Sequence, residues 1–143
     1  MSFRETLFIE LADTDETGVI YFASLFRLSH RVLEAFFRKH IKPLSYYFKE
    51  TPYLFPVVHV EGNFYRPVRF DDALEVELSV KSLGNRSFIL KYQFYKVGLL
   101  ALDSEITYAF MDSRIQKSVP LSEELRSLLV PFLMKEALTE IRQ

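Results

Sequence analysis

Hydrophobic residues alternate with polar ones in residues 3–11 and again after residue 56, and they follow a helical period in residues 21–40. In residues 3–11, Leu7, Ile9 and Leu11 occupy every second position, which predicts a strand. Residues 21–40 instead carry hydrophobic side chains at helical spacing, with charged side chains elsewhere on the wheel. These hydrophobic positions are Phe22, Leu25, Phe26, Leu33, Phe36 and Phe37. One long amphipathic helix with an aromatic-rich buried face is predicted.

The alternating pattern returns after residue 56. Strands are predicted at residues 57–65, 73–83, 87–96 and 99–111. Gly84-Asn85 and Val97-Gly98 separate the last three strands and predict hairpin turns. The sequence therefore predicts an antiparallel meander after the helix.

Two segments have weaker patterns. Between Pro43 and Pro56, the stretch that contains Tyr46, Tyr47 and Phe48 is predicted to be irregular, with room for a helical turn or two. Residues 121–142 have helical spacing, but Pro131 is expected to end or kink that helix near its middle. We expect this tail to be a surface appendage.

The element order predicts one α+β domain over residues 1–143, with a five-strand antiparallel sheet, one long helix and a C-terminal helix. A single helix covers only one face of such a sheet. Phe8, Tyr65 and Tyr95 are expected on the outward face, where they are poor choices for contact with solvent. We therefore expect a homo-oligomer.

The composition excludes several classes of function. The 18 basic and 19 acidic residues give a net charge of −1 and are interspersed, which disfavours binding to nucleic acid. Cysteine is absent, so disulfides and thiolate chemistry are excluded. No segment is apolar enough to span a membrane and no leader peptide is recognisable, so we expect a soluble, cytoplasmic protein without membrane partners.

The usual catalytic motifs are also missing. His30, His40 and His59 are far apart and have no carboxylate at ligand spacing, so neither a metal nor another cofactor is expected. With only four glycines, the chain has no Gly-x-Ser-x-Gly elbow and no phosphate-binding glycine loop. A serine-triad hydrolase and a nucleotide-triphosphate enzyme are both disfavoured.

An acidic loop, residues 12–18, leads directly into the long helix. A helix N-terminus presents unpaired N–H groups and a partial positive charge, which can polarise a carbonyl oxygen. A carboxylate on this loop could then act as a nucleophile or a general base. An aspartate before a helix is, however, more often simply a cap or a turn former.

The loop and its surroundings resemble the 4-hydroxybenzoyl-CoA thioesterase family of hotdog-fold proteins. The motif is Asp-x-Asp-x-x-Gly followed by two apolar residues and an aromatic one, here residues 13–22. The similarity continues through residues 55–59, 65–67 and 72–74 and covers about residues 4–112. The resemblance implies a hotdog fold and hydrolysis of an acyl-CoA.

The resemblance assigns roles to single residues of the loop. It implies that Asp15 is catalytic, as nucleophile or general base, and that the Phe22 backbone N–H polarises the thioester carbonyl. Gly18 is expected to allow the close approach of the substrate. Asp13 is expected to be structural.

The resemblance also narrows the substrate. Family members that act on aliphatic acyl-CoAs often have a histidine where this chain has Phe22. The Tyr21-Phe22 pair and residues 56–59, which end in His59, look most like the members that hydrolyse 1,4-dihydroxy-2-naphthoyl-CoA in naphthoquinone biosynthesis. 4-Hydroxybenzoyl-CoA and short or medium aliphatic acyl-CoAs remain open. Phe22 is equally compatible with a core aromatic residue, and His59 is more compatible with a buried strand residue than with a substrate contact.

The resemblance implies that basic residues near a sheet edge and a neighbouring subunit bind the CoA phosphates. It also implies a homo-oligomer that is a dimer of dimers. Arg86 is the first candidate, with Arg66 and Arg69 behind it, although a turn arginine is commonly just solvated. Hotdog folds also include dehydratases and non-catalytic proteins. A dehydratase is disfavoured because no histidine lies at the helix entry, while a non-catalytic acyl-CoA binder remains an alternative.

Overall fold

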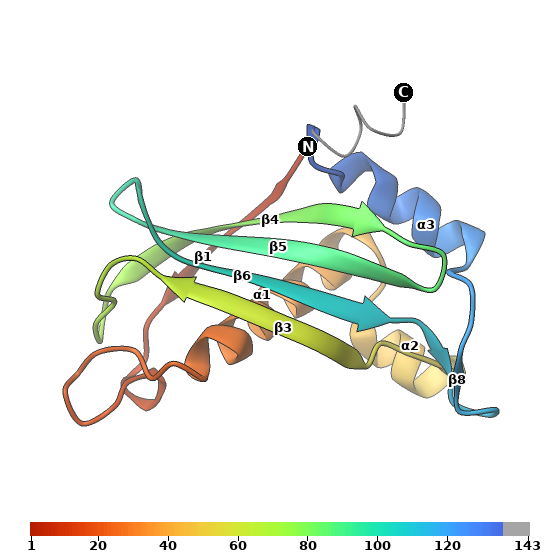
Figure 1. Cartoon of the computed structure of the whole chain (residues 1–143), viewed down its shortest axis with the longest axis horizontal. Helices are drawn as coiled ribbons and strands as arrows, with labels where there is room; N and C mark the ends of the chain where they lie inside the picture. Colours follow the sequence, from red (N-terminus) through yellow and green to blue (C-terminus); the bar gives the residue numbers. More distant parts are fainter. Residues whose placement is uncertain (136–143) are drawn as a thin grey trace.

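Five antiparallel strands form one sheet, and a long helix covers one of its faces (Figure 1). The structure is a computed structural model that describes residues 1–135. The strand order is β1-β4-β5-β6-β3. The strands are β1 (Phe3–Phe8), β3 (Val57–Phe64), β4 (Ala73–Leu83), β5 (Ser87–Lys96) and β6 (Leu99–Ala109), and the helix is α1 (Ser24–His40). This is the predicted hotdog arrangement, with α1 lying against the inner face of the sheet.

The core lies between α1 and this inner face. Alternate residues of β4 and β5 are buried, as the sequence pattern predicted. Leu25, Leu28 and Phe36 of α1 are also fully buried against the sheet. Two polar pairs are satisfied within this core. The Tyr92 and Tyr108 hydroxyls lie 2.7 Å apart, and the Ser29 hydroxyl of α1 lies 2.7 Å from that of Ser104.

The segment predicted to be irregular contains a regular seven-residue helix, of the length that the prediction left room for. α2 (Leu44–Glu50) begins directly after Pro43, whose fixed φ suits the residue before a helix. Tyr47 of α2 is buried against Phe37 and Phe55, with ring centroids 6.2 and 4.9 Å away. A second small sheet that was not predicted, β2 (Tyr53–Leu54), β7 (Met111–Asp112) and β8 (Lys117–Ser118), lies beside α2.

The C-terminal segment contributes to the core and is not the expected surface appendage. α3 (Glu123–Leu129) is followed by a short 3-10 helix, η2 (Val130–Phe132), so the helix ends at Pro131 as predicted. Leu125 and Leu129 are fully buried, and the Phe132 ring lies 4.8 Å from that of Phe36. The predicted continuation to residue 142 lies partly outside the described residues.

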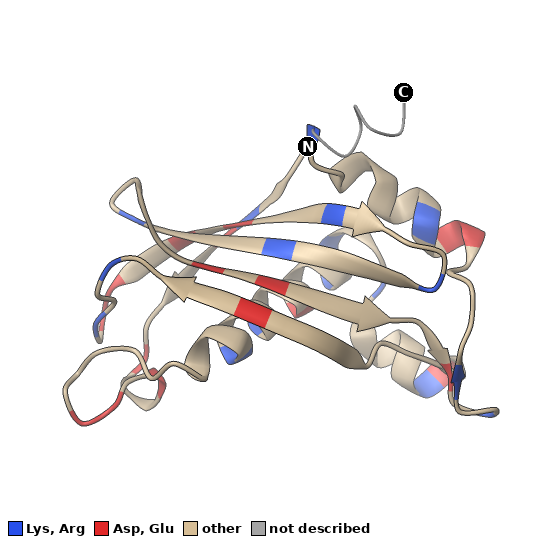
Figure 2. Cartoon of the chain, viewed as in Figure 1, with Lys and Arg blue, Asp and Glu red and all other residues tan. Residues whose placement is uncertain are grey.

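Of the aromatic residues expected on the outward face of the sheet, Phe8 and Tyr65 are 61 and 53% exposed and Tyr95 is half-buried, and the strands of the sheet also carry charged residues (Figure 2). Glu105 of β6 is half-buried, and its carboxylate contacts the ammonium groups of Lys81 at 2.7 Å and Lys91 at 3.9 Å. The edge strand β3 also presents apolar surface, and seven of its eight residues are exposed. Val58, Val60 and Phe64 are 60, 42 and 47% exposed. Among the described residues, no helix is long and apolar enough to cross a membrane.

Candidate active site

The loop between β1 and α1 lies at one end of the sheet, at the lower left of Figure 1. β1 ends at Phe8 instead of Leu11, because residues 11–13 form a short 3-10 helix, η1 (Leu11–Asp13). The chain then folds back on itself as a small hairpin. The Tyr21 N–H donates to the Asp13 carbonyl at 2.9 Å, and the Asp15 N–H donates to the Val19 carbonyl at 2.9 Å. These hydrogen bonds fix the two ends of the loop relative to each other.

The tip of this hairpin requires a glycine. Gly18 has a φ of 79°, in the left-handed region that other residues rarely adopt. Its N–H donates to the Asp15 carbonyl at 3.0 Å, which closes the turn directly after Asp15. Space around its α-carbon is open, since a Cβ there would meet nothing within 4 Å. Gly18 thus shapes the loop beside Asp15 and leaves that side unobstructed.

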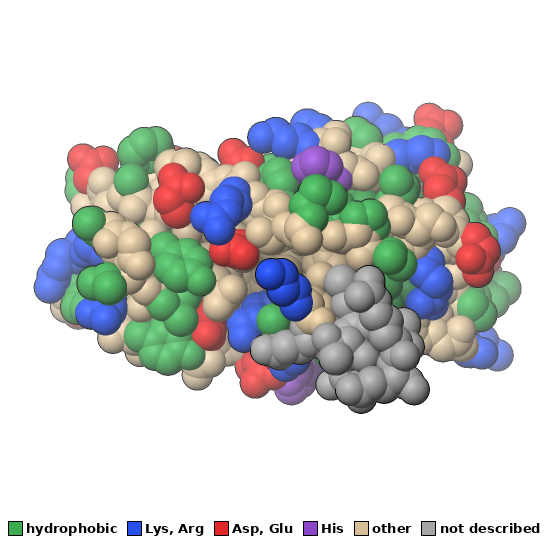
Figure 3. Space-filling model, turned by 90° about the horizontal axis from the view of Figure 1, so that it is seen from above, with side chains coloured by type: hydrophobic (Ala, Val, Ile, Leu, Met, Phe, Trp, Pro, Cys, Tyr) green, Lys and Arg blue, Asp and Glu red, His purple; other side chains and the backbone are tan. Residues whose placement is uncertain are grey.

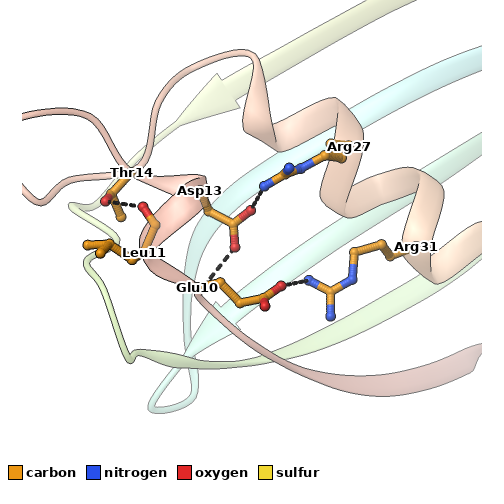
Figure 4. A network of polar contacts seen from close by, with 6 residues as sticks. All are labelled: Glu10, Leu11, Asp13, Thr14, Arg27 and Arg31. Carbon is orange, nitrogen blue, oxygen red and sulfur yellow. Dashed lines mark hydrogen bonds and ion pairs between the residues drawn. The ribbon is translucent and has the colours of Figure 1, made fainter.

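Asp13 has the surroundings of a structural residue (Figure 4). Its side chain is fully buried, and one carboxylate oxygen accepts a hydrogen bond from the Glu10 N–H at 2.8 Å. The other oxygen accepts a short hydrogen bond from the Arg27 guanidinium of α1. Asp13 therefore caps η1 and joins it to the first turns of α1. No pattern in the sequence pointed to Arg27, because its contact with Asp13 spans 14 residues.

Asp15 is exposed, and one of its carboxylate oxygens is hydrogen bonded to Thr17. That oxygen accepts hydrogen bonds from the Thr17 hydroxyl at 2.5 Å and from the Thr17 N–H at 2.8 Å. These hydrogen bonds, led by the one from the hydroxyl, hold the pKa of the Asp15 carboxyl below its usual value. The group is therefore an ionised carboxylate with one oxygen available for chemistry.

The start of α1 lacks a side-chain cap. The helix begins at Ser24, not Tyr21, and the residue before it, Ala23, cannot accept a hydrogen bond through its side chain. The N–H groups of Ser24, Leu25 and Phe26 donate to the carbonyls three residues earlier. Within residues 1–135, the N–H groups of Phe22 and Ala23 have no such acceptor. The helix thus begins with donors that an external carbonyl oxygen could accept from.

Phe22 and Tyr21 are surface residues. Phe22 is 63% exposed, so the core-aromatic interpretation and its place on the buried face of the helix were wrong. Its ring packs on that of Tyr21 with centroids 4.8 Å apart. The helix starts after Phe22, which removes this side chain from the helical stripe. Two exposed aromatic rings therefore lie at the entry to α1.

Two of the remaining predicted residues, His59 and Arg86, lie farther from the loop in this chain. His59 is on the outward face of β3 with its side chain 64% exposed and 3.9 Å from Glu61, so the buried interpretation was wrong. Arg86 is in the β4–β5 turn at the other end of the sheet, where it donates to the Ser118 carbonyl at 3.3 Å. Arg66 and Arg69, in contrast, follow β3 at the end that holds the Asp15 loop.

An apolar cavity of about 160 Å³, which the sequence did not indicate, lies between α1, α2 and β2. Its lining is mainly aromatic and aliphatic: His30, Leu33, Leu44, Tyr47, Phe48, Tyr53, Leu54 and Phe55. The cluster of aromatic residues at positions 46–48 was the available signal, but without α2 its position could not be inferred. Residues 1–135 contain no group of three potential ligands that could hold a metal ion.

Comparison with known proteins supports the resemblance read from the sequence. The model of the thioesterase-like superfamily matches residues 9–129. A 1,4-dihydroxy-2-naphthoyl-CoA hydrolase from Microcystis aeruginosa is 30% identical over 121 residues, which cover 85% of this chain and 88% of that protein. The enzyme of the same name from Rippkaea orientalis is 32% identical over 127 residues, covering 85% and 90%.

Solved structures support the fold. A 1,4-dihydroxy-2-naphthoyl-CoA thioesterase from Synechocystis superposes with a TM-score of 0.84 at 21% identity, covering 91% of this chain and 96% of that one. A gentisyl-coenzyme A thioesterase superposes with a TM-score of 0.79 at 20% identity, covering 89% and 98%. At this level of identity the superpositions show a shared hotdog fold.

Proposed function

The chain belongs to the thioesterase-like superfamily and is a thioester hydrolase, and from this premise we propose that it hydrolyses 1,4-dihydroxy-2-naphthoyl-CoA. The observation that carries the proposal is the half-engaged carboxylate of Asp15 on the loop that leads into an uncapped helix start. The names of the relatives at about 30% identity support the choice of acyl group.

In the proposed reaction, the thioester carbonyl oxygen accepts a hydrogen bond from the Phe22 N–H at the start of α1. The partial positive charge of the helix stabilises the negative charge that develops on this oxygen. The free oxygen of Asp15 either attacks the carbonyl carbon or removes a proton from an attacking water. The C–S bond then breaks, the CoA thiolate leaves and takes up a proton, and the acid is released. If Asp15 attacks directly, water hydrolyses the resulting anhydride.

We further propose that the site is completed by a second copy of the chain. β3 is an edge strand with a row of unpaired backbone groups and exposed valines, which a soluble protein normally covers. Antiparallel pairing of two β3 strands would bring the Asp15 loop of one copy alongside the α2 end of its partner. The cavity at that end suits an aryl group better than a long aliphatic chain, because its volume is only about 160 Å³ and its lining includes the rings of Tyr47, Phe48, Tyr53 and Phe55.

The test is hydrolysis of a panel of thioesters by the native chain and by Asp15→Asn. 1,4-Dihydroxy-2-naphthoyl-CoA should be the best substrate, ahead of 4-hydroxybenzoyl-CoA and hexanoyl-CoA. Asp15→Asn should lower kcat by about 10²–10⁴-fold, the range expected for loss of an acid–base or nucleophilic group. Full turnover by Asp15→Asn would refute the catalytic role, and a preference for hexanoyl-CoA would refute the aryl substrate.

A further inference from the structure

The two faces of β3 differ in chemistry, with polar side chains outward and apolar ones toward α1. The Asn63 side chain donates to the Asp103 carboxylate of β6 at 2.8 Å, and the two residues are register partners. A Cβ at Gly62 would instead meet a side chain of α1, so this neighbouring position faces the helix. Because side chains alternate along a strand, His59 and Glu61 share the outward face with Asn63. Both are exposed, and their imidazole and carboxylate lie 3.9 Å apart.

The hydrogen-bonding pattern of β3 determines which of its backbone groups point to the open edge of the sheet. The Tyr65 N–H donates to the Ala101 carbonyl of β6 at 2.8 Å. In an antiparallel ladder every second residue pairs in this way, and the residues between them direct their N–H and C=O groups to the other side. Within residues 1–135, the groups that point away from β6 therefore belong to Val58, Val60, Gly62 and Phe64.

A second copy of the chain engages all of these groups in one register. Two β3 strands related by a two-fold axis are antiparallel, so the first of these residues in one copy must lie opposite the last in the other. Val58 then pairs with Phe64 of the partner subunit, and Val60 pairs with Gly62 of the partner subunit. The two-fold axis passes through Glu61, and a shift of the register by two residues leaves some of these groups unpaired.

The opposite edge of the sheet is less suited to such pairing. β1 carries Arg4 and Glu5, whose ion pairs reach β4 and α1. Leu133 bridges to Val80 on the part of β4 that β1 does not cover. Figure 3 views the molecule from the side of β4 and α3, and acidic and basic side chains are interspersed there with hydrophobic ones. Charged side chains on an edge strand oppose pairing with another chain, so the second copy is expected at β3.

This register concentrates negative charge at the two-fold axis. The two Glu61 side chains face each other from Cα atoms about 4.5 Å apart, and like charges directly opposite destabilise strand pairing. Glu105 of β6, the register partner of Glu61, is in contact with Lys81 and Lys91, so its charge is already offset. His59 lies diagonal to Glu61 of the partner subunit, within reach of its carboxylate. A protonated imidazole at this position supplies the balancing charge.

The other groups that face His59 are neutral or acidic. On β6 of the same chain its register partner is Thr107. On the partner subunit it would lie opposite Asn63, whose amide is bound to the buried carboxylate of Asp103. The charges that face the imidazole from its own strand, from β6 and from the partner are therefore those of carboxylates.

We propose that the pairing of two β3 strands is centred on Glu61 and is held by protonated His59, with each imidazolium beside the Glu61 pair. The proposal rests on the shared site of the proposed function and makes assembly of that site depend on pH. Histidine changes its charge at about pH 6.5, so the paired state binds more protons than two separate chains. Association should tighten as the pH falls through this range and weaken as it rises.

Sedimentation velocity as a function of pH tests the role of His59. From about pH 8 to about pH 5.5, the dissociation constant of the native pair should fall about tenfold, the effect of two weak ion pairs between partly exposed groups. His59→Gln should keep the weaker value throughout, and Glu61→Gln, which removes the carboxylate pair, should keep the tighter value. His40→Gln, at the exposed C-terminal end of α1, is the matched control and should follow the native chain. A pH dependence that survives in His59→Gln would overturn the proposal.

The absence of cysteine allows the register to be tested separately. Oxidation should cross-link Glu61→Cys into a covalent pair, because Cα atoms about 4.5 Å apart are within the range of a disulfide. His59→Cys, two positions along the same face, is the control and should not cross-link, since the two copies of position 59 would be roughly 13 Å apart. Cross-linking of His59→Cys in preference to Glu61→Cys would overturn the register.

These results can be separated from the proposed activity, because neither experiment uses a substrate. Suppose that the pH dependence and the cross-linking hold, but that dilution to single chains leaves kcat/KM unchanged. The shared active site then fails, and the role of His59 in association stands.

Discussion

Asp13 and Asp15 are two residues apart, but their carboxylates have different surroundings. Asp13 is buried with both oxygens bound, and Asp15 is exposed with one oxygen free. The structural role usual for an aspartate before a helix applies to Asp13, which caps η1. Asp15 does not cap α1, and this difference could not be read from the spacing of the two residues.

The two aspartates should therefore separate stability from catalysis. Asp13→Asn removes a charged acceptor from the buried contact with Arg27 and should lower the free energy of unfolding by about 1.5–3 kcal/mol. Asp15→Asn should leave the free energy of unfolding nearly unchanged while lowering kcat by about 10²–10⁴-fold. Denaturation in urea, monitored by circular dichroism, measures the free energy of unfolding of the two variants. Equal stability losses in the two variants would contradict these assignments.

Thr17 should set the acidic limit of activity. Its hydrogen bonds favour the ionised form of Asp15 and lower its pKa, so activity is complete above that pKa and is lost only as the pH falls through it. Thr17→Val removes the hydroxyl donor, which is the largest cause, and should move the acidic limb of kcat/KM to higher pH. Thr14→Val is the control, because the Thr14 hydroxyl donates to the Leu11 carbonyl instead. A limb that stays in place in Thr17→Val would contradict the role of this hydroxyl.

At the scale of elements, the period of hydrophobic residues predicted those strands and helices that pack one face against the core. The strands of the meander and the body of α1 were predicted because half their residues face one continuous core. α2 was not placed, because its seven residues contain too few turns to show a period. The start of α1 was placed early because the aromatic residues at 21 and 22 continue the helical spacing although they lie on the surface.

Gly62 of β3 fixes how closely α1 approaches the edge strand. A Cβ at this position would lie 2.6 Å from the Leu25 side chain, which is fully buried at the helix start. Gly62→Ala should therefore destabilise the protein by about 1–3 kcal/mol, which exceeds the gain of about 0.4–1 kcal/mol from a stiffer unfolded chain. The free energy of unfolding from urea denaturation measures the net effect.

A double-mutant cycle checks the cause. In the Leu25→Ala background the clash is absent, so Gly62→Ala should cost less there than in the native chain. The same loss in both backgrounds would show that Leu25 is not the obstacle. The kinetics of Gly62→Ala then report whether the position of the helix start matters for turnover.

At the scale of the whole molecule, the sequence predicted exposed apolar side chains but did not single out the edge strand β3. Phe8 and Tyr65 are exposed as expected, but the ion pairs between neighbouring strands were not predicted. The ion pairs depend on the register of neighbouring strands, which the sequence does not specify. The valines of β3 were predicted as part of an ordinary strand, because the sequence does not show that β3 lies at the edge of the sheet.

Disrupting the β3 edge should separate the copies and stop turnover together. Val58→Lys introduces a charge at an exposed edge position, so the chain should still fold, but sedimentation should show a smaller species with much reduced kcat/KM. Ile115→Lys makes the same change at an exposed turn and should affect neither. A monomeric Val58→Lys protein with native kcat/KM would refute a shared active site.

The charged outward face has a consequence for how the molecule behaves in solution. The Lys81–Glu105–Lys91 ladder keeps this broad surface hydrated, so two such sheets can stack only through ionic contacts that remain partly solvated. Added salt screens contacts of that kind over a few ångströms and leaves apolar strand pairing almost untouched. Any larger assembly built on this face should therefore dissociate in concentrated salt into units that keep their β3 pairing. Ionic strength would then regulate the size of the assembly without loss of the catalytic unit.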